Sequence, residues 1–184
     1  MSDNNPTLPP LPEREQIALL EPFEGLGLKD IVVVTTLQDA ERAAATLLDA
    51  RVAGFDTESK PTFAKNEVSG GPHVVQFSTR DTAWLFQLHR TECNPVVATL
   101  IHNRLNIEPQ AVFDIDNEFR RRGYRKSVGV KAAVALVFNR RFVKSRKATT
   151  SNWANKQLTE AQIRYAANDA YASIRVFDAL LPAS

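Results

Sequence analysis

Short apolar runs alternate with longer amphipathic stretches along this chain. The runs are rich in β-branched and aromatic side chains and predict strands, whereas the longer stretches repeat apolar residues at helical spacing. Strands are predicted at residues 30–34, 52–58, 73–78, 83–88 and 111–115. Helices are predicted at residues 13–20, 37–50, 95–105, 117–122, 128–138 and from 160 onward, with caps at Thr36, Asn94, Asp116 and Thr159. Strands interleaved with helices predict an α/β domain with a mixed sheet.

The last helix carries the strongest local signals. Thr159 and Gln162 form the spacing of a capping box, and Leu158 and Ile163 fit the accompanying hydrophobic staple. Its predicted buried stripe consists of Ile163, Ala167, Ala170, Ile174, Phe177 and Leu181. Tyr165 and Asp169 are four residues apart, so they lie one turn apart on a face that adjoins this stripe.

The two ends of the chain differ in composition. Residues 1–12 contain four prolines and several small polar residues, which predicts a disordered tail before one domain at residues 13–184. A single cysteine, Cys93, excludes an intrachain disulfide and a cysteine-rich zinc site. There is neither an N-terminal leader pattern nor an apolar run of membrane-spanning length, so we expect a cytoplasmic protein without a membrane partner.

Two carboxylates close the apolar run at residues 52–55. Asp56 and Glu58 are two residues apart, and in a strand this spacing directs both side chains to one face. Like charges at the end of a buried strand are unfavourable unless a cation lies between them. At this point two interpretations stay open, namely solvated acids at a strand end and ligands of a cation.

An Asp-x-Glu strand followed by a late Tyr-x-x-x-Asp helix resembles the DEDD exonuclease superfamily. The segments 54–58, 151–153 and 165–171 are similar to those of its tyrosine (DEDDy) branch, as in ribonuclease D and Werner-type exonuclease domains. The resemblance extends from about residue 30 to the C-terminus. It implies an RNase H-like fold, a mixed β-sheet flanked by helices, and hydrolysis of phosphodiester bonds from a 3′ end.

The resemblance also implies a two-ion centre. Asp56 would bridge two Mg²⁺ or Mn²⁺ ions, Glu58 and Asp169 would complete the shell of one, and Tyr165 would orient the attacking water. Oxygen ligands suit these ions, and two of them could hold the phosphate and stabilise the leaving oxygen.

The family pattern contains four carboxylates, and this chain departs from the pattern at the third one. The family segment that carries this aspartate and one strand is missing after residues 95–98, and Val97 stands at the expected position. We therefore expect a sheet short of one strand, with an unpaired edge, and weaker support for the second ion. Asp114 or Asp116 is the alternative source of the missing ligand.

Positive charge is concentrated between residues 120 and 147, which contain eleven Lys/Arg and no acid. Such a segment is either a solvated surface or a phosphate-binding surface, and interleaved aromatic residues favour stacking on unpaired bases. The predicted nucleic-acid ligands are Arg140, Arg141, Lys144, Arg146, Lys147 and Trp153.

Three functions follow from these patterns. The first is a metal-dependent 3′–5′ exonuclease acting on the 3′ ends of single-stranded DNA or RNA. The second is a catalytically inactive, nucleic-acid-binding relative that lost the third acid. The third is an α/β interaction domain in which the carboxylates have no catalytic role.

Overall fold

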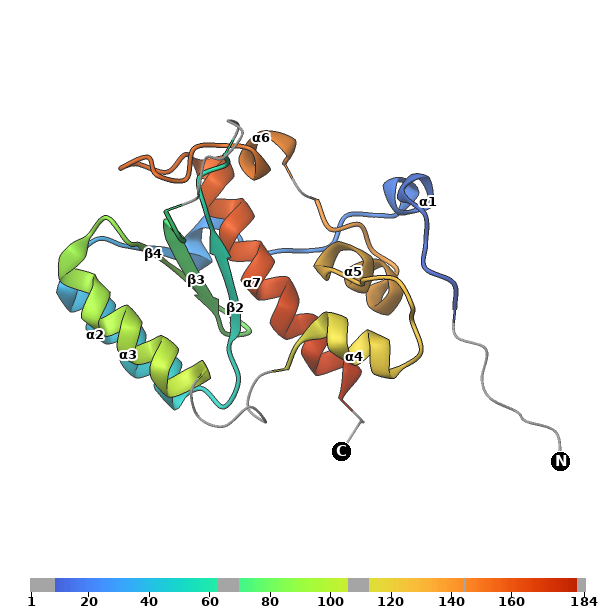
Figure 1. The fold of residues 1–184 in the computed structure, drawn as a ribbon, viewed down its shortest axis with the longest axis horizontal. Helices are drawn as coiled ribbons and strands as arrows, with labels where there is room; N and C mark the ends of the chain where they lie inside the picture. Colours follow the sequence, from blue (N-terminus) through green and yellow to red (C-terminus); the bar gives the residue numbers. More distant parts are fainter. Residues whose placement is uncertain (1–8, 63–69, 106–112, 144, 182–184) are drawn as a thin grey trace, which may run out of the picture.

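A mixed four-stranded sheet forms the centre of the protein in the computed structural model, which describes residues 9–62, 70–105, 113–143 and 145–181 (Figure 1). The strands are β1 (Ile31–Val34), β2 (Gly54–Glu58), β3 (Val74–Ser78) and β4 (Ala83–Gln87), in the order β1-β4-β3-β2. β1 is parallel to β4, and the other two pairs are antiparallel. The predicted α/β class with a mixed sheet is therefore confirmed, and β2 is an edge strand of this sheet.

One face of the sheet is covered by α2 (Leu37–Asp49) and α3 (Asn94–Leu105), which lie side by side (Figure 1). Large apolar residues fill this layer, among them Leu47, Phe77, Phe86 and Leu100, all of which are fully buried. Thr36 caps α2 as predicted, because its side chain accepts a hydrogen bond from the backbone N–H of Asp39.

The opposite face is covered by α7 (Glu160–Leu180), which crosses β2, β3 and β4. Its first turn forms the predicted capping box between Thr159 and Gln162. Small side chains bring the helix very close to the sheet: Ala166, Ala167 and Ala170 are fully buried, and a Cβ atom at Gly54 would collide with the carbonyl oxygen of Ala170. The absence of a side chain at Gly54 thus allows β2 and α7 to lie this close together.

Helices α1 (Arg14–Leu19), α4 (Ile115–Arg121) and α5 (Val130–Phe138) extend the molecule on the far side of α7 from the sheet (Figure 1). Helix α6 (Arg146–Thr149) lies near the N-terminal end of α7, and 3-10 turns at Leu28–Asp30 and Thr91–Cys93 precede β1 and α3. α5 packs on α7 through Val134 and Val176, so α7 is covered on both sides. None of the described helices combines the length and apolar character needed to cross a membrane.

Four predictions about local structure were wrong. Ile115 begins α4 instead of ending a strand, whereas residues 111–112 lie outside the described residues. Asp114, not Asp116, caps α4 and accepts a hydrogen bond from the Asn117 N–H at 2.8 Å. Asn94 lies inside α3, because the turn at Thr91–Cys93 leads directly into the helix. Leu181 lies beyond the end of α7 and is 46% exposed.

Two described residues of the predicted tail contact the rest of the protein. The hydroxyl of Tyr124 donates a hydrogen bond to the carbonyl oxygen of Pro9 at 2.8 Å. Leu11 packs against the apolar cluster that α5 and α7 share. Packing against the domain therefore begins at least at Pro9, and residues 1–8 lie outside the described residues.

Candidate metal centre

β2 and α7 bring three carboxylates into one cluster, formed by Asp56, Glu58 and Asp169. One carboxylate oxygen from each residue lies within 4.8 Å of the others. Asp56 and Glu58 are half-buried on the strand, and Asp169 is 1% exposed on the helix. The structure thus brings together the three residues predicted as metal ligands, although Asp169 lies 111 to 113 residues after the other two along the chain.

Backbone geometry explains why the carboxylates converge. The two-residue period of β2 places Asp56 and Glu58 on the face that α7 covers, together with Gly54. Asp169 precedes Ala170, whose carbonyl oxygen lies against Gly54, so the helix delivers the third carboxylate beside the strand. The N–H of Thr57 donates to Oδ1 of Asp56 at 2.8 Å and orients that carboxylate.

The chemistry of this donor set fits a hard divalent cation. Three carboxylates at this separation repel one another unless a cation or a proton neutralises them. Oxygen donors suit Mg²⁺ and Mn²⁺, whereas softer metals favour nitrogen and sulfur ligands, and the cluster contains neither histidine nor cysteine.

Tyr165 lies one turn before Asp169 on α7 and is 8% exposed. Its ring packs against Trp153, with the ring centroids 5.8 Å apart. Trp153 itself is 1% exposed and belongs to the apolar cluster beneath α7. The prediction that Trp153 stacks on bases was therefore wrong, because Gln162 holds the preceding loop through Ser151 Oγ at 3.0 Å and the indole is directed inward.

Asp114 and Asp116 do not belong to the carboxylate cluster found among the described residues. Asp114 caps α4. Asp116 accepts a hydrogen bond from the Val128 N–H at 2.7 Å and pairs with Nε of Arg120 at 2.9 Å. The Val128 hydrogen bond and then the Arg120 guanidinium lower the pKa of Asp116. Both acids thus stabilise the connection around α4.

Part of the basic segment is engaged within the protein. Arg120, Arg121 and Arg122 pair with the acids of α4. Arg141 is half-buried, and its backbone bonds to Glu21 and Phe23 while its guanidinium donates to the Ala18 carbonyl oxygen at 3.3 Å.

Of the other predicted nucleic-acid ligands, Arg140 and Lys147 are exposed. Lys144 lies outside the described residues, as does the side chain of Arg146. Among the described side chains of the predicted nucleic-acid surface, the exposed cations are therefore Arg140, before residue 144, and Lys147, after it.

Two amides beside the cluster were missed by the sequence analysis. Gln76 on β3 lies directly opposite Asp56 and is fully buried. Asn168 accepts a hydrogen bond from the Leu26 N–H at 2.7 Å and so attaches the segment before β1 to α7 beside Asp169. A polar residue inside the apolar run at residues 74–77 was the available signal for Gln76.

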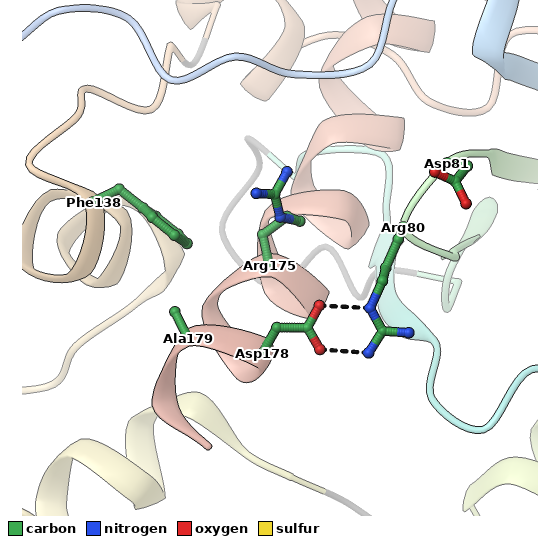
Figure 2. Close-up of a pocket in the computed structure, with 6 residues that line it drawn as sticks. All are labelled: Arg80, Asp81, Phe138, Arg175, Asp178 and Ala179. Atoms are coloured by element: carbon green, nitrogen blue, oxygen red, sulfur yellow. Dashed lines mark hydrogen bonds and ion pairs between the residues drawn. The ribbon is translucent and has the colours of Figure 1, made fainter. Parts of the chain in front are cut away.

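A pocket of about 490 Å³ lies at the C-terminal end of α7, and none of its lining residues belongs to the cluster (Figure 2). Arg80 and Asp178 face each other there with two contacts of 2.8 and 2.6 Å, and the carboxylate raises the pKa of the guanidinium. The Arg175 Nη1 donates to the Tyr171 hydroxyl at 2.6 Å. Two acids balance the two arginines, so the pocket carries no excess positive charge for a phosphate.

Comparison with known proteins identifies the family. A family model described as 3′-5′ exonuclease matches residues 72–183, which is more than half of the chain. The protein therefore belongs to the 3′–5′ exonuclease family, as its motifs predicted. The match contains Tyr165 and Asp169, and the fold adds Asp56 and Glu58 to them. Among curated protein sequences, none matches the chain.

Solved structures share the fold at low sequence identity. The Aedes aegypti Nibbler EXO domain is 18% identical, with a TM-score of 0.64 over 86% of this chain and 91% of that one. Trypanosoma brucei RNase D, solved with RNA U12, is 16% identical, with a TM-score of 0.68 over 84% and 63%. Escherichia coli RNase D, an exoribonuclease, is 16% identical, with a TM-score of 0.62 over 80% and 43%. The chain spans less than two thirds of either RNase D.

Proposed function

We propose that this protein is a metal-dependent exonuclease that hydrolyses phosphodiester bonds at the 3′ end of single-stranded nucleic acid. The carboxylate cluster of Asp56, Glu58 and Asp169 carries the proposal, because its oxygen donors come from the two elements that bear the family motifs. Membership of the 3′–5′ exonuclease family indicates the class of reaction, and we propose that the carboxylate cluster is where this reaction takes place.

Asp56, Glu58 and Asp169 would hold one Mg²⁺ or Mn²⁺ ion. When bound, the ion would supply Lewis-acid stabilisation of the negative charge that develops on the phosphate. The phenol of Tyr165, one turn from Asp169, would orient the attacking water, because a phenol both donates and accepts a hydrogen bond. Trp153 would keep that ring in place through the contact described above.

A second ion would have weaker support. Within the described residues no fourth carboxylate joins the cluster, and Asp114 and Asp116 bond to α4 and its surroundings. We propose that the family segment with the third aspartate is missing from this chain of the tyrosine branch. We expect a lower rate of hydrolysis than with a complete two-ion centre. Between Mg²⁺ and Mn²⁺, the ion that the three carboxylates bind more tightly should give the higher rate.

The nucleic acid would be held through its phosphates. Arg140 and Lys147 are exposed and belong to the segment without acids, so they are the described candidates for phosphate contacts. Such contacts position a strand without reading its sequence, which suits a nuclease that removes nucleotides one after another.

The test is cleavage of a 5′-labelled single-stranded oligonucleotide, as DNA and as RNA, with Mg²⁺, Mn²⁺ or EDTA. We expect products shortened stepwise from the 3′ end with a divalent cation and none in EDTA. Asp56→Asn and Asp169→Asn should abolish this shortening. Asp178→Asn is the matched control, since this carboxylate lies on α7 outside the cluster. Binding of the oligonucleotide without cleavage under every condition would contradict the proposal and indicate an inactive binding protein.

A further inference from the structure

A buried amide beside the carboxylate cluster is not explained by the packing around it. Gln76 is fully buried, and neither its Nε2 nor its Oε1 has a hydrogen-bond partner among the described residues. Burying an amide without partners is unfavourable, so native structures usually give such a group a hydrogen-bond partner or a role.

Other buried glutamines show what a structural role looks like in this protein. Gln87 is 4% exposed, and its Nε2 donates to the Asn155 carbonyl oxygen at 3.0 Å. Gln162 is 2% exposed, and its side chain forms the capping box and holds Ser151. Gln76 has no comparable task, although it lies in the same layer between the sheet and α7.

The position of Gln76 in the sheet indicates what it can reach. The register places it between Asp56 on β2 and Leu85 on β4, and Leu85 packs in the cluster formed with Tyr165 and Ala166. Directly opposite residues in an antiparallel pair have Cβ atoms about 4.5–5.5 Å apart on one face. The amide lies two carbons beyond Cβ, so it can reach the carboxylate of the opposite aspartate.

We propose that Gln76 is a positioning residue of the metal centre, whose amide donates a hydrogen bond to the carboxylate of Asp56 when the cluster binds a divalent cation. This inference rests on the proposed function. A carboxylate can accept several hydrogen bonds, so the bond would add to the one from the Thr57 N–H. Two donors from different strands would fix the carboxylate in one orientation and satisfy the buried amide.

The decisive measurement is Mn²⁺ binding by isothermal titration calorimetry without nucleic acid, together with thermal unfolding in EDTA. Gln76→Met keeps the length of the side chain and removes the amide. We expect its affinity for Mn²⁺ to fall about tenfold or more, as for other residues that orient metal ligands. Its Tm in EDTA should be unchanged or higher, because a buried amide without partners is replaced by an apolar group.

Gln87→Met is the matched control on the neighbouring strand. It should lower the Tm in EDTA, because it removes the bond to Asn155, and leave Mn²⁺ affinity unchanged. If wild type binds Mn²⁺ and Gln76→Met binds it within twofold of wild type, the inference is wrong and the proposed function is unaffected. If wild type binds neither Mn²⁺ nor Mg²⁺, both are wrong.

A measurement on the wild-type protein avoids any folding defect in the variant. Titration with Mg²⁺ should shift the side-chain NH₂ signals of Gln76 in a ¹⁵N correlation spectrum and slow their hydrogen exchange. The signals of Gln87 should stay in place. If the backbone signal of Thr57 shifts at saturation while the Gln76 side chain does not respond, Gln76 does not donate to the cluster.

Discussion

Replacing Asp169 by asparagine should stabilise the protein in EDTA and remove its response to divalent cations. Coulomb repulsion between two unit charges at the 4.8 Å limit of the cluster is about 3.5 kcal/mol at an effective dielectric constant of about 20, and about 0.9 kcal/mol in bulk water. The substitution removes the repulsion of Asp169 with both Asp56 and Glu58. For two pairs the repulsion lies between about 1.7 and 7 kcal/mol, and because Asp56 and Glu58 are half-buried we expect the lower part of this range, about 2–3 kcal/mol.

Thermal unfolding in EDTA and with Mn²⁺ measures both parts of this prediction. A gain of about 2–3 kcal/mol corresponds to a rise in Tm of roughly 4–12 °C for a protein of this size. Wild type should gain stability as Mn²⁺ is added, since the cation binds only the folded cluster, and Asp169→Asn should lose most of this gain.

Asp178→Asn is the control for a carboxylate on the same helix. It should lower stability in EDTA by at most about 1 kcal/mol, because its partner Arg80 is exposed, and keep the Mn²⁺ response of wild type. The reasoning would be refuted if Asp169→Asn lowered the Tm in EDTA and kept the full Mn²⁺ response. That result would mean that the three carboxylates do not act together on a cation.

Four further substitutions test the packing around the site, the exposed cations and the capped region of α4. Gly54→Ala should destabilise the fold by about 1–3 kcal/mol in urea unfolding and weaken Mn²⁺ binding, because the added Cβ collides with the Ala170 carbonyl and separates β2 from α7. Trp153→Ala should lower the free energy of unfolding by about 3–5 kcal/mol, whereas Lys147→Ala should leave it unchanged and reduce the salt dependence of oligonucleotide binding. The pKa of Asp116 is lowered in the folded protein, so this carboxylate stabilises the fold above its unfolded pKa and loses that effect as the pH falls through its folded pKa. Wild type should therefore exceed Asp116→Asn in stability at pH 6, and urea unfolding should show this advantage decreasing as the pH is lowered below about 4.

Local patterns were sufficient wherever neighbouring residues decide the outcome. Thr159 and Gln162 satisfy each other's backbone groups within one turn, so the start of α7 could be predicted without knowledge of the fold. The shared face of Asp56 and Glu58 follows from the period of a strand in the same way. The two motifs, at residues 54–58 and 165–171, could therefore be assigned to a strand and a helix in the order that the family shows.

Contacts between distant segments decided the rest. The sequence around Trp153 does not show whether its indole stacks on a base or packs in the core, because both are compatible with a basic segment that contains aromatic residues. The packing of α7 on the sheet buries this indole. Asp116 on α4 likewise accepts a hydrogen bond from Val128 and pairs with Arg120. These contacts engage Asp116 away from the metal ligands and neutralise one of the cations of the basic segment.

By itself, then, the sequence determined strand β2 with its two acids and the capped start of α7, because each depends on the spacing of residues within one strand or helix. Only the tertiary structure decided that these acids meet Asp169, through the approach of Gly54 to Ala170. It also placed Gln76 beside Asp56, because strand register depends on how β2 and β3 pair and is not encoded in either strand alone.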